Sequence, residues 1–250
     1  FKQKTAYEIM PSLVGSEMCI RDRDISAPEY GDYEVLDNFQ KHSYPWGIMV
    51  NTDGNRFVDE GEDLRNHTYV KFGREIMKQP NRTAIQIFDQ KTIPLLRDEY
   101  RIRQVTKVSG NSIAELAQEL EINVSALTKT IDEFNAACKP GNFNPSILDG
   151  VATTGLNPNK TNWALPIDEA PFEAFITTTG VTFTFGGLKV DDKGSVLDNN
   201  DRSISGLFAA GELVGGLFYE NYPGGSGLMA GAVYGKIAGE NAASHAIGNS

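Results

Sequence analysis

The sequence predicts a mixed α/β fold of the α+β kind, because helical and strand patterns occur in separate blocks along the chain. Two amphipathic helices are indicated in its middle part, and a strand-rich block precedes a glycine-striped helix near the C-terminus. At 250 residues, with 40% hydrophobic and 22% charged side chains, the chain is long enough to build one or two globular cores.

The first segment, residues 1–23, has neither a helical nor a strand period, and its apolar core is too short for a signal peptide. Its sequence, FKQKTAYEIMPSLVGSEMCIRDR, resembles a translated sequencing-adapter read fused to the end of an assembled gene. We therefore expect an artefactual or disordered leader without function, with a natural disordered leader as the alternative.

Local signals predict the elements of the middle of the chain. Two short apolar runs flank Asp53 and Gly54 within residues 47–63, which is typical of a hairpin. A helix that opens with a Ser-x-x-Glu capping box is expected over residues 111–122, and a second amphipathic helix over residues 123–138. The stretch that follows is rich in Pro, Asn, Gly and Thr, so we expect a long ordered loop or a crossing between domains.

The last third of the chain reads as strands followed by one helix. Residues 174–190 and 194–213 are dense in β-branched and aromatic side chains and predict strands. The helix expected over residues 224–239 carries glycine at every fourth position from Gly227, at a cost of about 1 kcal/mol each relative to alanine. A stripe of glycines lets another backbone or a flat ligand approach closely, so we expect this face to be packed.

Composition excludes several classes of partner. A net charge of −10 and a pI near 4.8 argue against nucleic acid and against an anionic membrane surface. Lys236 and Glu240 interrupt the apolar run of the glycine helix, so no membrane span is expected. The two cysteines and three histidines show no metal-ligand spacing, which predicts no metal site and favours a reducing, cytoplasmic setting.

Two features of the C-terminal block point to cofactor chemistry. Glu212 follows the apolar run of residues 207–210 and Gly211, and a carboxylate at a strand end can bind a sugar hydroxyl. The turn YPGGSG places a helix N-terminus near Ser226, where free N–H groups favour an anion or an electron-rich oxygen. Together they suggest a cofactor that carries a ribityl chain, although each is also common as a purely structural feature.

The same blocks resemble a known family. TFTFGGLKVDDKG, SISGLFAAGELVGG, YPGGSGLMAGAVYGKIAGENAA and GIMVNTDGNRFVDEGED are similar to the flavoprotein family of fumarate reductase, succinate dehydrogenase and L-aspartate oxidase. Within it, FNAACKPGNFNPSILDG and KTNWALPIDEAPFEAF most resemble tricarballylate dehydrogenases. The resemblance covers residues 24–243 and implies an FAD-dependent oxidoreductase.

Membership would imply two domains. Residues 24–176 would form a capping domain that carries substrate-binding residues, and residues 177–250 the C-terminal part of a Rossmann-like FAD-binding domain. The GxGxxG turn of that domain's N-terminal βαβ unit is missing from this sequence. The chain therefore resembles the C-terminal portion of a larger enzyme, and one alternative is a truncated chain that is inactive by itself.

The resemblance also assigns roles to single residues. For the cofactor it implies Glu212 as the ligand of FAD hydroxyls, and the N–H groups of Gly227 and Leu228 as neighbours of the flavin pyrimidine oxygen, with Phe183 also at the flavin. Arg65 lies one residue away from the position of the family's catalytic arginine. The residues implied in substrate binding are His42, Thr182, Tyr222 and Gly225.

Two of these positions depart from the family pattern. Thr182 stands where a substrate-binding histidine is common, and Tyr222 where an arginine is common, which weakens the expected clamp for fumarate or succinate. A tyrosine in YPGG is similar to ketosteroid dehydrogenases, which gives a 3-ketosteroid dehydrogenase as an alternative function. Arg65 could instead form a surface ion pair with an acidic neighbour, and His42 could be a structural loop histidine. The acidic neighbours are Glu60, Glu62 and Asp63.

The reaction implied is oxidation or reduction of a C–C bond next to a carboxylate or carbonyl. A hydride would pass between one substrate carbon and flavin N5, while an acid or base handles the proton of the adjacent carbon. A tricarballylate-like carboxylate is the expected substrate, and a separate electron acceptor is the expected partner.

Overall fold

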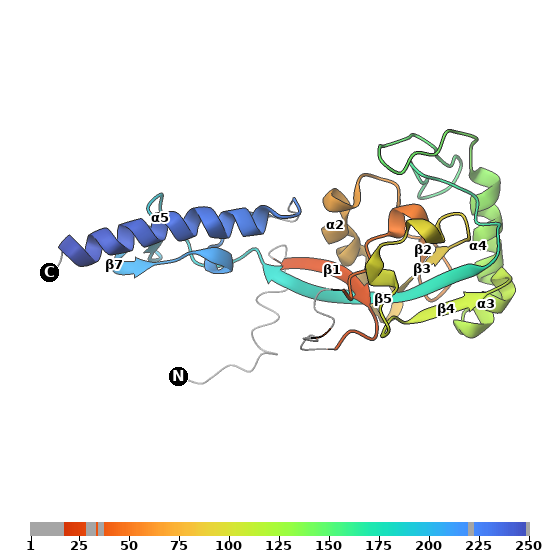
Figure 1. The fold of residues 1–250 in the computed structure, drawn as a ribbon, viewed down its shortest axis with the longest axis horizontal. Coiled ribbons are helices and arrows are strands. Elements are labelled where there is room, and N and C mark those ends of the chain that lie inside the picture. The colour runs from red at the N-terminus through yellow and green to blue at the C-terminus, as the bar shows by residue number, and fades with distance from the viewer. Residues whose placement is uncertain (1–17, 29–33, 35–37, 220–222, 249–250) are drawn as a thin grey trace. The chain divides into compact units, whose positions relative to one another are not determined.

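The computed structural model describes residues 18–28, 34, 38–219 and 223–248. It divides into two compact units (Figure 1), here called the first unit, Arg21–Gly180, and the second unit, which contains residues 181–250. The division follows Gly180, whereas the resemblance placed the domain boundary after Ile176. Each unit is described by itself below.

A five-stranded sheet forms the centre of the first unit. Its strand order is β1-β5-β3-β2, and β4 also pairs with β5; the pairs β2–β3, β3–β5 and β4–β5 are antiparallel. Ile48 lies opposite Ile87, and Ile87 lies opposite Ala174, so apolar side chains are stacked across three strands. The strands are β1 Met18–Asp24, β2 Ile48–Val50, β3 Ala84–Phe88, β4 Lys107–Gly110 and β5 Phe172–Thr184.

Helices α3 (Ile113–Glu119) and α4 (Val124–Ala137) cover one face of this sheet. Both begin where the sequence predicts, because the Ser112 hydroxyl accepts the N–H of Glu115 at 3.1 Å and the Asn123 side chain caps α4 in the same way. The core on this face contains Ile48, Val50, Ile85, Ile87, Leu116, Leu127, Ile131 and Phe134.

Helix α2 (Arg65–Met77) packs on the opposite face, because alternate strand residues point to opposite sides of a sheet. Met49 and Ala84, the sequence neighbours of the residues above, pack with Phe72 and Ile76 of α2. The first unit is thus an α/β/α sandwich, with α2 (orange) and α4 (green) at different sides of the strands in Figure 1. Short 3₁₀ helices cover Tyr44–Trp46, Pro80–Arg82, Ile93–Leu95 and Asp98–Tyr100.

The predicted hairpin exists only in part. Asn51 donates its N–H to the Asn55 carbonyl at 2.9 Å, and Gly54 takes a positive φ of 80°, so the tight turn forms. The returning run pairs with β2 through a single bridge, Val50 to Arg56, and the strand partner of β2 is β3. The chain after Arg56 leaves the sheet because it leads directly to α2.

The second unit is a small β-hairpin covered by one long helix. Strands β6 (Ser195–Leu197) and β7 (Ser203–Phe208) are antiparallel, a 3₁₀ turn follows at Gly211–Leu213, and α5 spans Ser226–Gly248. Figure 1 shows α5 (blue) running along the hairpin. A Cβ at Gly194 would lie 2.9 Å from the Cβ of Ala238, so glycine permits this close approach.

The glycine stripe of α5 is mostly open within the second unit. A Cβ at Gly231 would lie 3.7 Å from the Gly211 Cα, and a Cβ at Gly235 or Gly239 would meet no described atom within 4 Å apart from its own stretch of helix backbone. The expected close packing of the later glycines is therefore not seen among the residues that the structure describes.

The end of the predicted leader, residues 18–23, lies in β1, which pairs with β5. Sequence periodicity did not reveal this strand, and residues 1–17 lie outside the described part. No helix in the described ranges is both long and apolar enough to cross a membrane.

Candidate functional site

The first unit holds a cavity of about 360 Å³ that brings His42 and Arg65 together. His42 precedes the 3₁₀ helix at Tyr44–Trp46, and Arg65 is the first residue of α2, so the fold joins two positions that are separate in sequence. This cavity, here called the arginine cavity, is lined by His42, Pro45, Trp46, Leu64, Arg65, Asn66, Leu95, Arg97, Pro145 and Trp163.

Arg65 is half-buried, and no carboxylate among the described residues binds its guanidinium directly. Its side chain forms no hydrogen bond or ion pair to any residue that the structure describes, although its backbone carbonyl accepts from the Tyr44 hydroxyl at 3.4 Å. The alternative that Arg65 forms a surface ion pair with an acidic neighbour is therefore wrong, because each of these neighbours has another partner. Glu60 pairs with Arg56, Glu62 with Lys71, and Asp63 with His67.

Arg97 is the second guanidinium of this cavity. Burial, and next the positive charge of Arg97, lower the pKa of Arg65, while the charge of Glu99 acts in the opposite direction. Burial acts to raise the pKa of Glu99, but hydrogen bonds and charge from Arg97, together with the charge of Arg65, lower it. Glu99 is thus an ionised carboxylate beside two arginines.

A hydrogen-bonded network holds the His42 segment against the Arg97 segment. The Arg97 N–H donates to the Ser43 hydroxyl at 3.2 Å, and the Ser43 N–H donates to the Tyr100 hydroxyl at 2.8 Å. Lys41 Nζ donates to the Glu99 carbonyl at 2.9 Å. Because these contacts are buried or half-buried, they hold the segments of His42 and Arg97 in a fixed position relative to each other.

Two tryptophans form an aromatic wall of the cavity. The rings of Trp46 and Trp163 meet edge to face, with centroids 5.2 Å apart and planes at 77°. The Trp163 indole N–H donates to the carbonyls of Asn144 and Ile147 at 3.0 and 2.9 Å. Trp163 also has a positive φ of 55°, a conformation that costs a non-glycine residue about 1 to 2 kcal/mol.

Lys160 lies directly behind this wall. Its ammonium group is fully buried and donates to the carbonyls of Pro45 and Gly47, on either side of Trp46, at 2.8 and 2.6 Å. Burial lowers the pKa of Lys160 to about 8. The buried cation therefore fixes the backbone that presents Trp46.

In the second unit, a smaller cavity of about 200 Å³ brings three of the expected cofactor residues together. Glu212, Gly227 and Leu228 all line it, with Glu212 from the 3₁₀ turn and the other two from the first turn of α5. Glu212 Oε1 accepts the N–H of Thr184 at 2.8 Å, which orients the carboxylate. The remaining lining residues are Thr184, Gly211, Val214, Leu217, Phe218 and Ala230.

These residues fit one end of an FAD. Glu212 Oε2 accepts no hydrogen bond from the residues that the structure describes, so this oxygen can accept a sugar hydroxyl. The N–H groups in the first turn of a helix have no intrahelical acceptor, and Gly227 adds no side chain in front of them. Leu228, beside it, is 81% exposed, so the start of the helix is open to a ligand.

The other expected site residues are not placed in either cavity. Tyr222 lies outside the described residues; the backbones of Thr182 and Phe183 belong to β5, but their side chains also lie outside the described part. Gly225 precedes α5 with a positive φ of 89°, a conformation that favours glycine. Their roles stay predictions.

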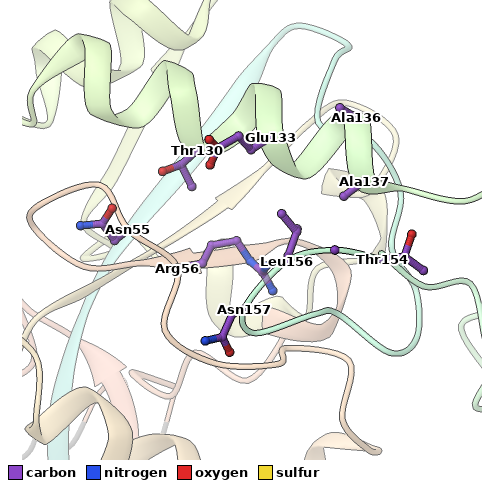
Figure 2. A pocket seen from close by; sticks show the side chains of 10 residues that line it. Asn55, Arg56, Thr130, Glu133, Ala136, Ala137, Thr154, Leu156 and Asn157 are labelled. Carbon is purple, nitrogen blue, oxygen red and sulfur yellow. The ribbon is translucent and has the colours of Figure 1, made fainter.

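A third cavity, of about 600 Å³, lies between α4 and two loops of the first unit (Figure 2). Arg56 lines it, but its guanidinium is already bound to Glu60 and to the carbonyls of Val58 and Pro158. None of the residues expected to bind substrate or cofactor lines this cavity. It is larger than the arginine cavity, yet it offers no unneutralised cation.

Sequence reasoning missed Arg97, Trp46 and Trp163 as lining residues and did not predict α2. An arginine in a charged stretch such as LLRDEYRIR is typical of a solvated surface, so no local signal marked Arg97. The helix had a detectable signal, because Tyr69, Phe72 and Ile76 recur at helical spacing.

The first unit thus holds a cavity lined by two arginines, and the second unit holds a cavity lined by Glu212 and Gly227. A family described as FAD binding domain matches residues 34–228, so the chain belongs to this family. A probable fumarate reductase of Shewanella frigidimarina is 34% identical over 203 residues, covering 80% of this chain. The match covers 31% of that relative, so the chain spans about a third of its length.

Solved structures agree with this assignment. The open conformation of a flavocytochrome c3 fumarate reductase matches with a TM-score of 0.62 and 27% identity, covering 91% of this chain and 37% of that one. A 3-ketosteroid Δ1-dehydrogenase from Sterolibacterium denitrificans matches with a TM-score of 0.64 and 22% identity, covering 91% and 43%. The second likeness concerns the fold alone.

Proposed function

We propose that this chain is part of an FAD-dependent oxidoreductase that forms or reduces a C–C double bond next to a carboxylate. The observation that carries the proposal is the arginine cavity, which Arg65 and His42 both line and in which the Arg65 side chain makes no direct ion pair or hydrogen bond to a residue that the structure describes. An unneutralised, half-buried guanidinium favours a bound carboxylate, because the pair can form charge-assisted hydrogen bonds on both edges of the arginine.

The second unit would hold the cofactor. Glu212 would bind an FAD hydroxyl, and the N–H groups of Gly227 and Leu228 would face the flavin pyrimidine oxygen. FAD, when bound, supplies a hydride acceptor or donor at N5. The first turn of α5 would favour negative charge near it by about 0.3–1 kcal/mol.

In the dehydrogenation direction, one substrate carbon loses a hydride and the adjacent carbon loses a proton, which leaves a double bond. Arg65 would hold or pass this proton. Its lowered pKa supports that role, because a guanidinium with an ordinary pKa gives up its proton less readily. The two electrons would leave the enzyme through a separate acceptor.

The substrate we propose is a polycarboxylate similar to tricarballylate. The two guanidinium groups of the arginine cavity support a polyanion over a 3-ketosteroid, which carries no carboxylate to bind them. A 3-ketosteroid is therefore the competing outcome of the test.

The test uses the flavin-loaded protein that contains this sequence. Turnover is measured with tricarballylate, succinate, fumarate and a 3-ketosteroid, each with an artificial electron acceptor or donor. We expect turnover of a carboxylate, and we expect Arg65→Lys to lower kcat by more than about 100-fold. The change in KM should be smaller than the change in kcat, because lysine keeps a positive charge for the carboxylate. Arg103→Lys, at an exposed arginine outside the cavity, is the matched control.

Turnover of the steroid alone would overturn the substrate class, and unchanged kcat in Arg65→Lys would overturn the role of Arg65. A separate FAD titration of the 250-residue chain, followed by flavin absorbance, tests whether this chain holds the cofactor by itself. No band shift there would support the alternative that the chain alone is inactive.

A further inference from the structure

We propose that Arg97 is a second carboxylate-binding residue of the arginine cavity, so that this cavity selects substrates with two or more carboxylates. This inference rests on the proposed function, because it concerns the same cavity. Arg65 and His42 would hold one carboxylate and Arg97 another.

Donor geometry is the first argument. Arg97 uses Nε and Nη2 toward Glu99, with Nε 2.9 Å from Oε1 and 3.2 Å from Oε2 and Nη2 2.9 Å from Oε1. A guanidinium has five N–H donors, and Nη1 of Arg97 forms no hydrogen bond or ion pair with a described residue. Arg97 can therefore keep Glu99 and still offer the edge formed by Nη1 and Nη2 to a second carboxylate.

Orientation is the second argument. Glu99 is only 11% exposed at its side chain, and the Arg97 backbone is tied to Ser43, so the base of the Arg97 side chain is fixed. The Arg97 side chain as a whole is 44% exposed, and Arg97 lines the cavity. A long side chain that is anchored at its base and open at its tip loses little further entropy when it binds a ligand.

Charge is the third argument. Two guanidinium groups line the cavity. Glu99 is bound to Arg97, and its negative charge also attracts Arg65. Arg65 and Arg97 repel one another; burial first, and then the charge of Arg97, lower the pKa of Arg65. One carboxylate bound at each arginine would relieve this repulsion, whereas a monocarboxylate can relieve only part of it.

Ligand binding in this cavity can be followed by the fluorescence of its two tryptophans. The chain has two tryptophans in all, and both Trp46 and Trp163 line the arginine cavity. Intrinsic tryptophan fluorescence of the 250-residue chain therefore reports occupancy of this cavity without any flavin or turnover.

The experiment titrates the chain with succinate and with butyrate, a monocarboxylate with the same number of carbon atoms, at fixed ionic strength. In the wild-type chain we expect succinate to bind more tightly. In Arg97→Gln we expect the Kd of succinate to rise about 10- to 100-fold and that of butyrate to change less than about threefold. Arg97→Lys should give an intermediate loss, and Arg103→Gln should change neither Kd.

The outcomes separate this inference from the proposed function. If the wild-type chain binds both acids and Arg97→Gln weakens both equally or neither, the selection by Arg97 is wrong and the carboxylate site stands. If the wild-type chain binds neither acid, the carboxylate site itself is wrong. Near-UV circular dichroism of each variant, to which Trp46 and Trp163 contribute, checks that the cavity has kept its shape. If Arg97→Gln does not fold, the result for Arg97→Lys decides.

Discussion

Arg56 and Glu60 form a buried ion pair in the loop that leads to Arg65, with Arg56 Nη2 2.5 Å from Glu60 Oε2. The same carboxylate accepts the N–H of Met49 in β2 at 2.8 Å, so it ties the loop to the sheet. The desolvation of Arg56 acts to lower its pKa, but the charge and hydrogen bonds of Glu60 outweigh it and raise the pKa. The start of α2, and with it Arg65, depends on this pair.

We expect Glu60→Gln to lower the free energy of unfolding by about 3–5 kcal/mol, because it leaves the Arg56 cation buried without a counter-charge. Urea denaturation followed by circular dichroism measures the change. Glu62→Gln is the matched control, since Glu62 pairs with Lys71 on the surface and its loss should cost about 0–1 kcal/mol. Equal effects of the two substitutions would contradict the structural role of Glu60.

Lys160 should make the stability depend on alkaline pH. Its folded-state pKa, about 8, lies below the ordinary value of 10.5, so between these values the unfolded chain binds more protons and stability rises with pH. Protonated Lys160 therefore destabilises the fold by up to about 3 kcal/mol at and below pH 7. Lys160→Met should remove this rise.

The measurement compares urea denaturation of wild type and Lys160→Met at pH 7, 9 and 10.5. From pH 7 to pH 10.5, the unfolding free energy of the wild type should rise by about 3 kcal/mol relative to that of Lys160→Met. Lys129→Met, at a residue with a 73% exposed side chain, should show a constant difference. Parallel curves for wild type and Lys160→Met would show that Lys160 has an ordinary pKa.

Cys138 should be an unreactive thiol. Burial raises its pKa from 9.0 to about 11, which lowers its thiolate fraction at pH 8 about 100-fold. In a Cys19→Ser background, alkylation by iodoacetamide should be at least that much slower in the folded chain than in urea. Similar rates under the two conditions would mean that Cys138 is accessible and ordinary.

Gly235→Ala should stabilise α5 in this chain. A Cβ at this position meets nothing within 4 Å, so the substitution adds helix propensity of about 1 kcal/mol without a clash. Helicity by circular dichroism and the thermal midpoint of the 250-residue chain should both rise. A fall would mean that the glycine face is packed against something in solution, as the sequence pattern suggested.

Much of the secondary structure could be predicted because its signals are local. The capping residues Ser112 and Asn123 set the starts of α3 and α4, and β-branched residues marked β5. The partner of β2 could not be predicted, because pairing with β3 depends on contacts that are distant in sequence. The single-bridge hairpin at Asp53 and Gly54 shows that a turn signal does not fix strand partners.

The sequence also marked part of the candidate sites. Glu212 was proposed from its place at a strand end and Gly227 from the family resemblance, and both line one cavity of the second unit. His42 and Arg65 were found by resemblance, and the first unit places them in another. Arg97 had no pattern of its own.

The sequence by itself determined the mixed α/β class, the caps of its central helices and the glycine stripe, since each depends on residues within a turn or two of one another. Tertiary structure alone decided which charged side chains are buried and which can still bind a ligand. Lys160 is enclosed while Arg97 keeps an open edge, although both are cations in polar segments. Burial is set by the side chains that pack around a residue, and these come from distant parts of the chain.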